Sequence, residues 1–210
     1  MSDVHADEPV MTAGTDPSAA DAAVVLLHGR GASARSILGM ASEFHRPGVA
    51  FLAPQAANNE WYPNSFLAPV ADNEPHLSSA LGKVEATLDR AADAGIPTER
   101  TALLGFSQGA CLASEFAARN PTRYGGIVAL SGGLIGDSVD PDDYTGSLDG
   151  TPAFFGCSDV DPHIPEERVH ASTTVYDRLD ADVTERIYEG MGHTVNEDEI
   201  AFVASLVEDL

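Results

Sequence analysis

The sequence predicts an α/β domain with a mostly parallel sheet covered by helices on both faces, and three observations lead to this prediction. Short apolar runs recur along the 210-residue chain and alternate with longer segments whose apolar residues follow helical spacing. The runs are apolar throughout, which is typical of strands buried on both faces of a parallel sheet. The chain also contains 19 Gly and 13 Pro, which supply the tight connections that such a fold needs.

Each element of this fold can be assigned in order. The expected strands are residues 22–28, 49–53, 101–106, 126–130, 152–156 and 183–188, with an antiparallel edge strand at about 9–14. The expected helices are residues 33–44, which Ser33 can cap, 78–94, 108–119, 163–179 and 196–207. Two long irregular stretches, 55–75 and 132–151, follow strands, at positions where sites are built. No linker interrupts the chain, so residues 1–210 are expected to form one domain, with a flexible arm at about 1–8.

The charge balance excludes several kinds of partner. Asp and Glu number 33 against 11 Lys and Arg, which gives a formal net charge of -22. Nucleic acids and anionic membranes would both be repelled by this charge. The acidic residues are spread along the chain and predict a salt-loving organism, because salt screens their mutual repulsion to about 3 Å at 1 M. An acidic protein from an ordinary organism is the alternative interpretation.

No membrane-spanning or secreted segment is expected. No apolar run approaches the ~18 residues that a membrane helix needs. The first 21 residues also lack the basic start and apolar stretch of a secretory signal. The two cysteines, Cys111 and Cys157, lie far apart and are expected to be buried free thiols, so a cytoplasmic protein is predicted. Both a monomer and a homodimer are compatible with these observations.

A candidate nucleophile stands at the end of the expected strand 101–106. Residues 105–109 read GFSQG and match G-x-S-x-G, with Ser107 at the centre. The pattern alone is weak in a glycine-rich chain, but here it follows a strand and opens a helix, as a nucleophile elbow must. An ordinary strand-to-helix turn with a capping serine is the alternative. The context favours Ser107 as the nucleophile of a hydrolase.

A serine nucleophile needs a histidine base and an acid, which follow it in this fold in the order Ser, acid, His. Of the histidines after Ser107, His170 falls inside an expected helix and His163 begins that helix. His193 lies in a glycine-rich turn after the last strand, where it can reach the edge of the sheet, and it is the expected base. For the acid, spacing alone does not separate Asp159 from Asp161, since both follow the strand 152–156.

The segment HGRG at residues 28–31 follows the first expected strand and resembles the H-G-x-G segment that supplies part of the oxyanion hole in esterases of this fold. The expected donors are the backbone N–H groups of Arg30 and of Gln108, the residue after the nucleophile. The side chain of His28 is expected to be structural.

Together these segments resemble the phospholipase/carboxylesterase family of small α/β-hydrolases, which includes acyl-protein thioesterases. The resemblance rests on LHGRG at 27–31, GFSQGA at 105–110, LSG at 130–132, DPHIP at 161–165 and GH at 192–193. It implies an α/β-hydrolase fold with little or no lid, no cofactor and no metal. It also implies a triad of Ser107, Asp161 and His193, and so favours Asp161 over Asp159.

The sequence departs from the thioesterases of that family around the expected pocket. Arg30 stands where they carry an apolar residue, and the segment WYP at 61–63 resembles bacterial and archaeal esterases more. Three residues of this stretch are expected either to wall an acyl pocket or to serve as packing anchors, namely Trp61, Phe66 and Leu67. Arg30 is expected either to bind a substrate carboxylate, with Glu74 as its resting partner, or to face solvent.

The function predicted from these residues is a serine carboxylesterase that hydrolyses small short- to medium-chain esters through an acyl-enzyme. A lysophospholipase, an acyl thioesterase or a lactone hydrolase would use the same three residues and differ only in its pocket. A binding protein without catalysis on the same fold is disfavoured, since nucleophile, base, acid and oxyanion segment are all present.

Overall fold

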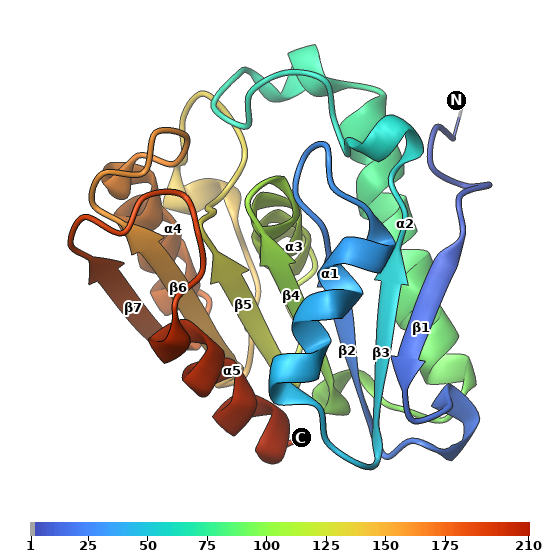
Figure 1. Ribbon diagram of the computed structural model, residues 1–210. Coiled ribbons are helices and arrows are strands. Elements are labelled where there is room, and N and C mark those ends of the chain that lie inside the picture. Colours follow the sequence, from blue (N-terminus) through green and yellow to red (C-terminus); the bar gives the residue numbers. More distant parts are fainter. Residues whose placement is uncertain (1–2) are drawn as a thin grey trace.

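The computed structural model describes residues 3–210 and confirms the expected α/β architecture (Figure 1). Seven strands form one sheet in the order β1-β3-β2-β4-β5-β6-β7. The strands are β1 (Val10–Gly14), β2 (Ala22–Leu27), β3 (Val49–Pro54), β4 (Thr101–Phe106), β5 (Gly126–Leu130), β6 (Pro152–Ser158) and β7 (Asp182–Tyr188). All neighbours are parallel except β1, which pairs antiparallel with β3 as an edge strand, as the sequence predicts.

Helices cover both faces of this sheet and make it a three-layer domain. The helices are α1 (Ala34–Met40), α2 (His76–Asp93), α3 (Gln108–Arg119), α4 (Glu166–Arg178) and α5 (Glu197–Glu208). Figure 1 shows α1 and α5 on the near face, with α2, α3 and α4 behind the sheet. Within residues 3–210, no helix combines the length and the apolar character needed to cross a bilayer.

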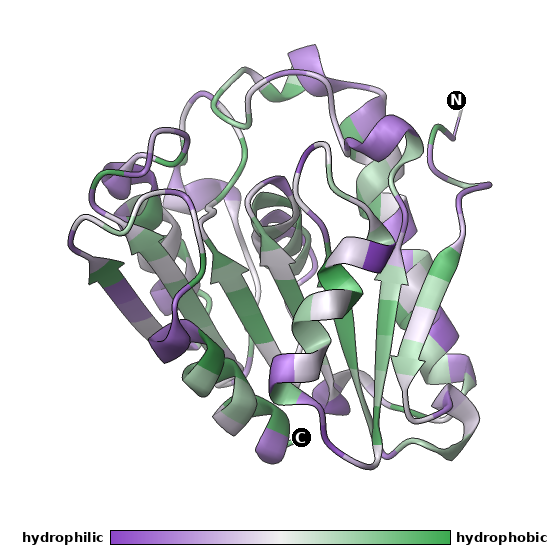
Figure 2. Cartoon of the chain, in the orientation of Figure 1, coloured by the Kyte–Doolittle hydropathy of each residue, from purple (hydrophilic) through white to green (hydrophobic). Residues whose placement is uncertain are grey.

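The sheet is apolar on both sides because successive strand residues point to opposite faces. In β2, Val25 and Leu27 join the core cluster beneath α2, α3 and α4, while Val24 and Leu26 join the one beneath α1 and α5. All six residues of β2 are buried. The hydropathy colouring shows that the central strands are mostly hydrophobic, whereas the edge strand β7 has a hydrophilic stretch (Figure 2).

Three helices differ at their ends from the sequence-based expectation. The helix expected from residue 163 begins only at Glu166, because Pro165 disfavours helical geometry in the residue before it. The helix expected over 33–44 ends at Met40 and continues as a short 3-10 turn, Ala41–Phe44. The helix expected from residue 78 starts two residues earlier, at His76.

The expectation of a flexible arm over residues 1–8 is wrong from Asp3 onward, whereas residues 1 and 2 lie outside the described part. His5 is completely buried, and its backbone N–H donates to Ser79 Oγ at 2.9 Å. Its ring accepts from the N–H of Ala57 at Nδ1 (3.0 Å), so Nε2 carries the hydrogen that is donated to the carbonyl of Trp61 (3.0 Å). Hydrogen bonds hold this segment against the rest of the domain. Its polar composition therefore did not reveal that it packs there.

Candidate active site

Ser107 lies at a sharp turn between β4 and α3. Its backbone angles, φ 56° and ψ -121°, are strained for a residue with a side chain. The two flanking glycines allow the turn: a Cβ on Gly105 would lie 2.1 Å from the carbonyl oxygen of Gly109, and one on Gly109 would lie 2.0 Å from that of Leu27. The close approach lifts the Ser107 hydroxyl above the end of the sheet, at the N-terminus of α3.

Three side chains from loops that follow separate strands form one hydrogen-bonded chain, namely Ser107, His193 and Asp161. Ser107 Oγ lies 2.8 Å from His193 Nε2, and His193 Nδ1 lies 2.7 Å from Asp161 Oδ2. The side chain of Asp161 is inaccessible to solvent, whereas 19% of the His193 side chain is exposed. Water can therefore reach the imidazole of His193 from one side, whereas the carboxylate of Asp161 is shielded from solvent.

The environment of Asp161 keeps it ionised. Burial by itself raises the pKa of this carboxyl, but the hydrogen bond from His193 and those from the backbone N–H groups of His163 and Ile164 outweigh it, so the pKa is lowered. Those two N–H groups donate to Asp161 Oδ1 at 2.8 and 3.1 Å. Because a carboxylate only accepts, Nδ1 of His193 carries the hydrogen and Nε2 is left to accept from Ser107.

The other acid and base candidates are not part of this chain of hydrogen bonds. Asp159 accepts from the N–H of Gly190 at 2.8 Å and so fixes the loop that carries His193, without touching the imidazole. His170 pairs with glutamates on the surface of α4 and β7. His163 lines the pocket, with its ring edge-on to that of His193 at a centroid distance of 4.8 Å.

Arg30 and Gln108 line the same pocket as Ser107. Among residues 3–210, the backbone N–H groups of Arg30 and Gln108 have no hydrogen-bond acceptor within the protein. Both are therefore available to an oxygen of a bound ligand. His28 has the expected structural role: it is buried, accepts from the N–H of Ala56 (3.1 Å), and its Nδ1 lies 2.8 Å from the carbonyl of Gly29.

A cavity of about 520 Å³ opens in front of Ser107. Its deep walls are buried side chains, namely Tyr62, Phe66, Cys111 and Ile164. Trp61 and Leu67 do not line it, which corrects the expectation that they wall an acyl pocket. Trp61 is buried in the core, where its indole N–H donates to the carbonyl of His28 at 2.8 Å.

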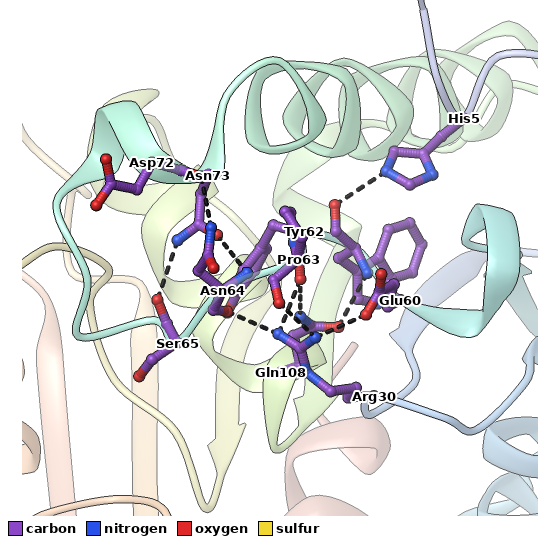
Figure 3. Close-up of polar contacts among 11 residues, drawn as sticks. His5, Arg30, Glu60, Tyr62, Pro63, Asn64, Ser65, Asp72, Asn73 and Gln108 are labelled. Carbon is purple, nitrogen blue, oxygen red and sulfur yellow. Dashed lines mark hydrogen bonds and ion pairs between the residues drawn. The ribbon is translucent and has the colours of Figure 1, made fainter.

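The expected pairing of Arg30 with Glu74 is also wrong. Arg30 Nη1 instead contacts Glu60 Oε2 at 2.6 Å. The two terminal nitrogens also donate to the backbone carbonyls of residues 62–64 (Figure 3). Glu74 accepts from the N–H and hydroxyl of Ser78 and so starts α2. The terminal nitrogens of the guanidinium are thus occupied within the protein, and Arg30 is not a free site for a substrate carboxylate.

Sequence reasoning missed a buried carboxyl beneath the histidine loop. Glu199 is inaccessible to solvent; its Oε2 accepts from the N–H of Asn196 at 2.9 Å, and among the described residues its Oε1 has no partner. Burial raises the pKa of Glu199 to about 7. Only a glycine at position 156 leaves room for it, because a Cβ there would lie 2.2 Å from Oε1. The capping-box spacing of Asn196 and Glu199 was the available signal.

Replacing Glu199 with Gln should stabilise the protein above neutral pH. In the wild type the fold holds the proton, so stability is lost as pH rises from the ordinary pKa of 4.5 to about 7. The amide keeps the cap without that loss, and we expect a gain on the order of 1–3 kcal/mol at about pH 8 that shrinks towards about pH 5. Melting temperature against pH measures this, with the exposed Glu197→Gln as control. A pH-independent difference would contradict the assignment.

The fold, with a serine at the elbow after the central strand β4, defines a hydrolase of the α/β class. The chain belongs to the phospholipase/carboxylesterase family, whose model matches residues 8–210. Members of this class are serine hydrolases, which confirms the predicted family and enzyme class. Among residues 3–210, no three His, Cys, Asp or Glu side chains are grouped to hold a metal ion.

Individual relatives agree with this family. A phospholipase/carboxylesterase structure from Dyadobacter fermentans DSM 18053 is 41% identical, with a TM-score of 0.92 over 96% of this chain and 97% of that one. The acyl-protein thioesterase 1 of Yarrowia lipolytica is 27% identical over 90% of this chain and 91% of its own. That of Saccharomyces cerevisiae is 33% identical over 71% of this chain, which spans only 65% of the yeast protein's length.

Proposed function

We propose that this hydrolase is a carboxylesterase for short- to medium-chain esters that works through an acyl-enzyme on Ser107. The observation that carries the proposal is the chain of hydrogen bonds from Ser107 through His193 to Asp161, 2.8 and 2.7 Å long. A serine hydroxyl is a weak nucleophile at neutral pH, and this arrangement supplies the base and the acid that activate it.

In the first step, Ser107 Oγ attacks the ester carbonyl while His193 Nε2 takes its proton. Asp161 holds the imidazole in the required tautomer and stabilises the imidazolium that forms. The carbonyl oxygen becomes negatively charged in the tetrahedral intermediate. The N–H groups of Arg30 and Gln108 stabilise that charge, helped by the N-terminus of α3 behind the nucleophile. The intermediate collapses, the C–O bond breaks, and the alcohol leaves with the proton from His193.

In the second step, water attacks the acyl-enzyme. His193 removes a proton from the water, a second tetrahedral intermediate forms, and Ser107 leaves with that proton as the carboxylic acid is released. The partial exposure of the His193 side chain provides the route for this water. No cofactor takes part in either step.

The pocket supports small and medium acyl groups. The cavity has a volume of about 520 Å³, and the aromatic residues Tyr62 and Phe66 line it. Apolar walls favour an aliphatic acyl chain, and we take the size of the cavity to favour short to medium chains. The names of the yeast relatives favour a second candidate, the hydrolysis of acyl thioesters, for which the same residues and steps would serve.

Hydrolysis of p-nitrophenyl acetate, butyrate, octanoate and palmitate, measured in concentrated KCl, tests the ester preference. We expect the highest kcat/KM on the acetate or butyrate and at least about a 10³-fold loss in Ser107→Ala, because the nucleophile is gone. A thermal melt checks that this variant is folded. A palmitate optimum would contradict the small-ester proposal, and residual activity above about a tenth of wild type would contradict Ser107 as nucleophile.

The Asp161→Asn variant should lose about 10³- to 10⁴-fold in kcat, because the amide can donate to Nδ1 and so favours the wrong tautomer of His193. Asp159→Asn is the matched control. Its amide oxygen can still accept from Gly190, so its kcat should stay close to that of the wild type. Steady-state kinetics on the best ester separates the two, and a larger loss in Asp159→Asn would reverse the assignment of the acid.

A further inference from the structure

One irregular segment forms a whole wall of the active-site pocket. We call residues 60–66 the strap. Its residues from Tyr62 to Phe66 all line the pocket, and the strap lies between two short 3-10 turns, Ala57–Asn59 and Val70–Asn73. Because it has no helix or strand of its own, its position depends on contacts made by other parts of the chain.

The guanidinium of Arg30 donates hydrogen bonds to four oxygens of the strap. Its Nη1 donates to Glu60 Oε2 at 2.6 Å and to the carbonyl of Pro63 at 3.0 Å. Its Nη2 donates to the carbonyls of Tyr62 at 2.8 Å and Asn64 at 2.7 Å. Three successive carbonyls therefore point at one cation, as Figure 3 shows. Such dipoles repel one another unless a positive charge stands between them.

The side chain of Gln108 holds the same strap from below. It is buried, and its Oε1 accepts from the N–H of Trp61 at 2.9 Å while its Nε2 donates to the carbonyl of Tyr62 at 2.8 Å. The Tyr62 carbonyl thus accepts from both Gln108 and Arg30. Arg30 and Gln108 are also the two lining residues whose backbone N–H groups are the expected oxyanion donors.

Contacts on the outer side hold the rest of the strap. The buried Asn73 accepts from the N–H of Asn64 at 2.9 Å and donates to the carbonyl of Ser65 at 3.0 Å. Asn64 Nδ2 donates to the carbonyl of Asp72 at 2.6 Å, and His5 binds the carbonyl of Trp61. These hydrogen bonds on the outer side come from neutral groups. A second guanidinium, that of Arg168, lies 5.7 Å from the centroid of the Phe66 ring, but the cation that binds the strap carbonyls is Arg30.

We propose that the side chains of Arg30 and Gln108 are positioning residues that couple the pocket wall to the oxyanion hole. Each residue gives its backbone N–H to the developing oxyanion and its side chain to the strap. The strap therefore fixes the backbone of both donors, and the donors fix the strap. This proposal rests on the proposed esterase function for its kinetic effect, whereas the clamping of the strap is independent of that function.

Removing the guanidinium should affect the transition state more than substrate binding. In Arg30→Ala, we expect kcat on p-nitrophenyl butyrate to fall about 10- to 100-fold with KM changed less than about threefold, since a displaced oxyanion donor matters once charge has formed. The matched control is Arg35→Ala, which removes an exposed arginine of α1 and should keep wild-type kinetics. A wild-type kcat in Arg30→Ala would overturn the proposal.

Chemical rescue distinguishes positioning from general loss of stability. Guanidinium added at millimolar concentration, far below what denatures proteins, should restore part of the kcat of Arg30→Ala, because the ion can occupy the vacated nest of carbonyls. Urea has nearly the same shape without the charge and should not restore it. No restoration by guanidinium, or equal restoration by urea, would overturn the role of the cation.

Hydrogen exchange measures how firmly the strap is held, and this measurement does not depend on enzymatic activity. Amides of residues 60–66 should exchange faster in Arg30→Ala than in the wild type or Arg35→Ala, and unchanged exchange would overturn the clamp. If the wild type hydrolyses no ester, the proposed function fails while this comparison still decides the clamp. If Arg30→Ala does not fold, Arg30→Lys replaces it: one ammonium cannot reach all four oxygens, so wild-type kcat and exchange in that variant would overturn the proposal.

Discussion

The left-handed backbone of Ser107 is the constraint on which the rest of the site depends. A positive φ in a residue with a side chain costs about 1–3 kcal/mol and persists only where the surroundings impose it. Here β2 and β5 flank β4 on both sides, and the N–H of Ser107 donates to the carbonyl of Leu130 at 2.9 Å. Gly105 and Gly109 remove the side chains that would block the turn. The stability of the parallel sheet is thereby used to hold one hydroxyl in a reactive position.

The site is assembled at one edge of the sheet from segments far apart in sequence. Strands β4 and β6 end at the loops of Ser107 and Asp161, and β7 leads to the loop of His193. Because these strands are parallel, their carboxyl ends all meet at the same edge. The loops also stabilise one another, since Ser158 Oγ accepts from the N–H of Gly192 at 2.9 Å. The side chains of Ser107, His193 and Asp161, the proposed nucleophile, base and acid, are thus brought within hydrogen-bonding distance of one another.

Much of the fold and the central chemistry could be predicted because the signals are local. The strand, G-x-S-x-G and helix around Ser107 lie within one short segment, and each buried strand shows as an apolar run. The contacts of the strap were not predictable in this way. Arg30 binds backbone carbonyls, which every residue has, so nothing in the sequence singled out Glu60 over Glu74. The packing of His5 could not be predicted either, because its ring and its backbone N–H bind groups that lie far away in sequence.

The pocket shows why conventional roles for aromatic residues can mislead. Trp61 was a plausible wall residue by type, yet its backbone N–H is bound by Gln108 and its ring lies in the core.

The most direct test of the account is to treat the protein with a fluorophosphonate, which reacts only with a serine that a neighbouring base activates, and to locate the adduct by peptide mass spectrometry. A single adduct on Ser107 is predicted. No adduct, or an adduct on another serine, would contradict the central role of Ser107.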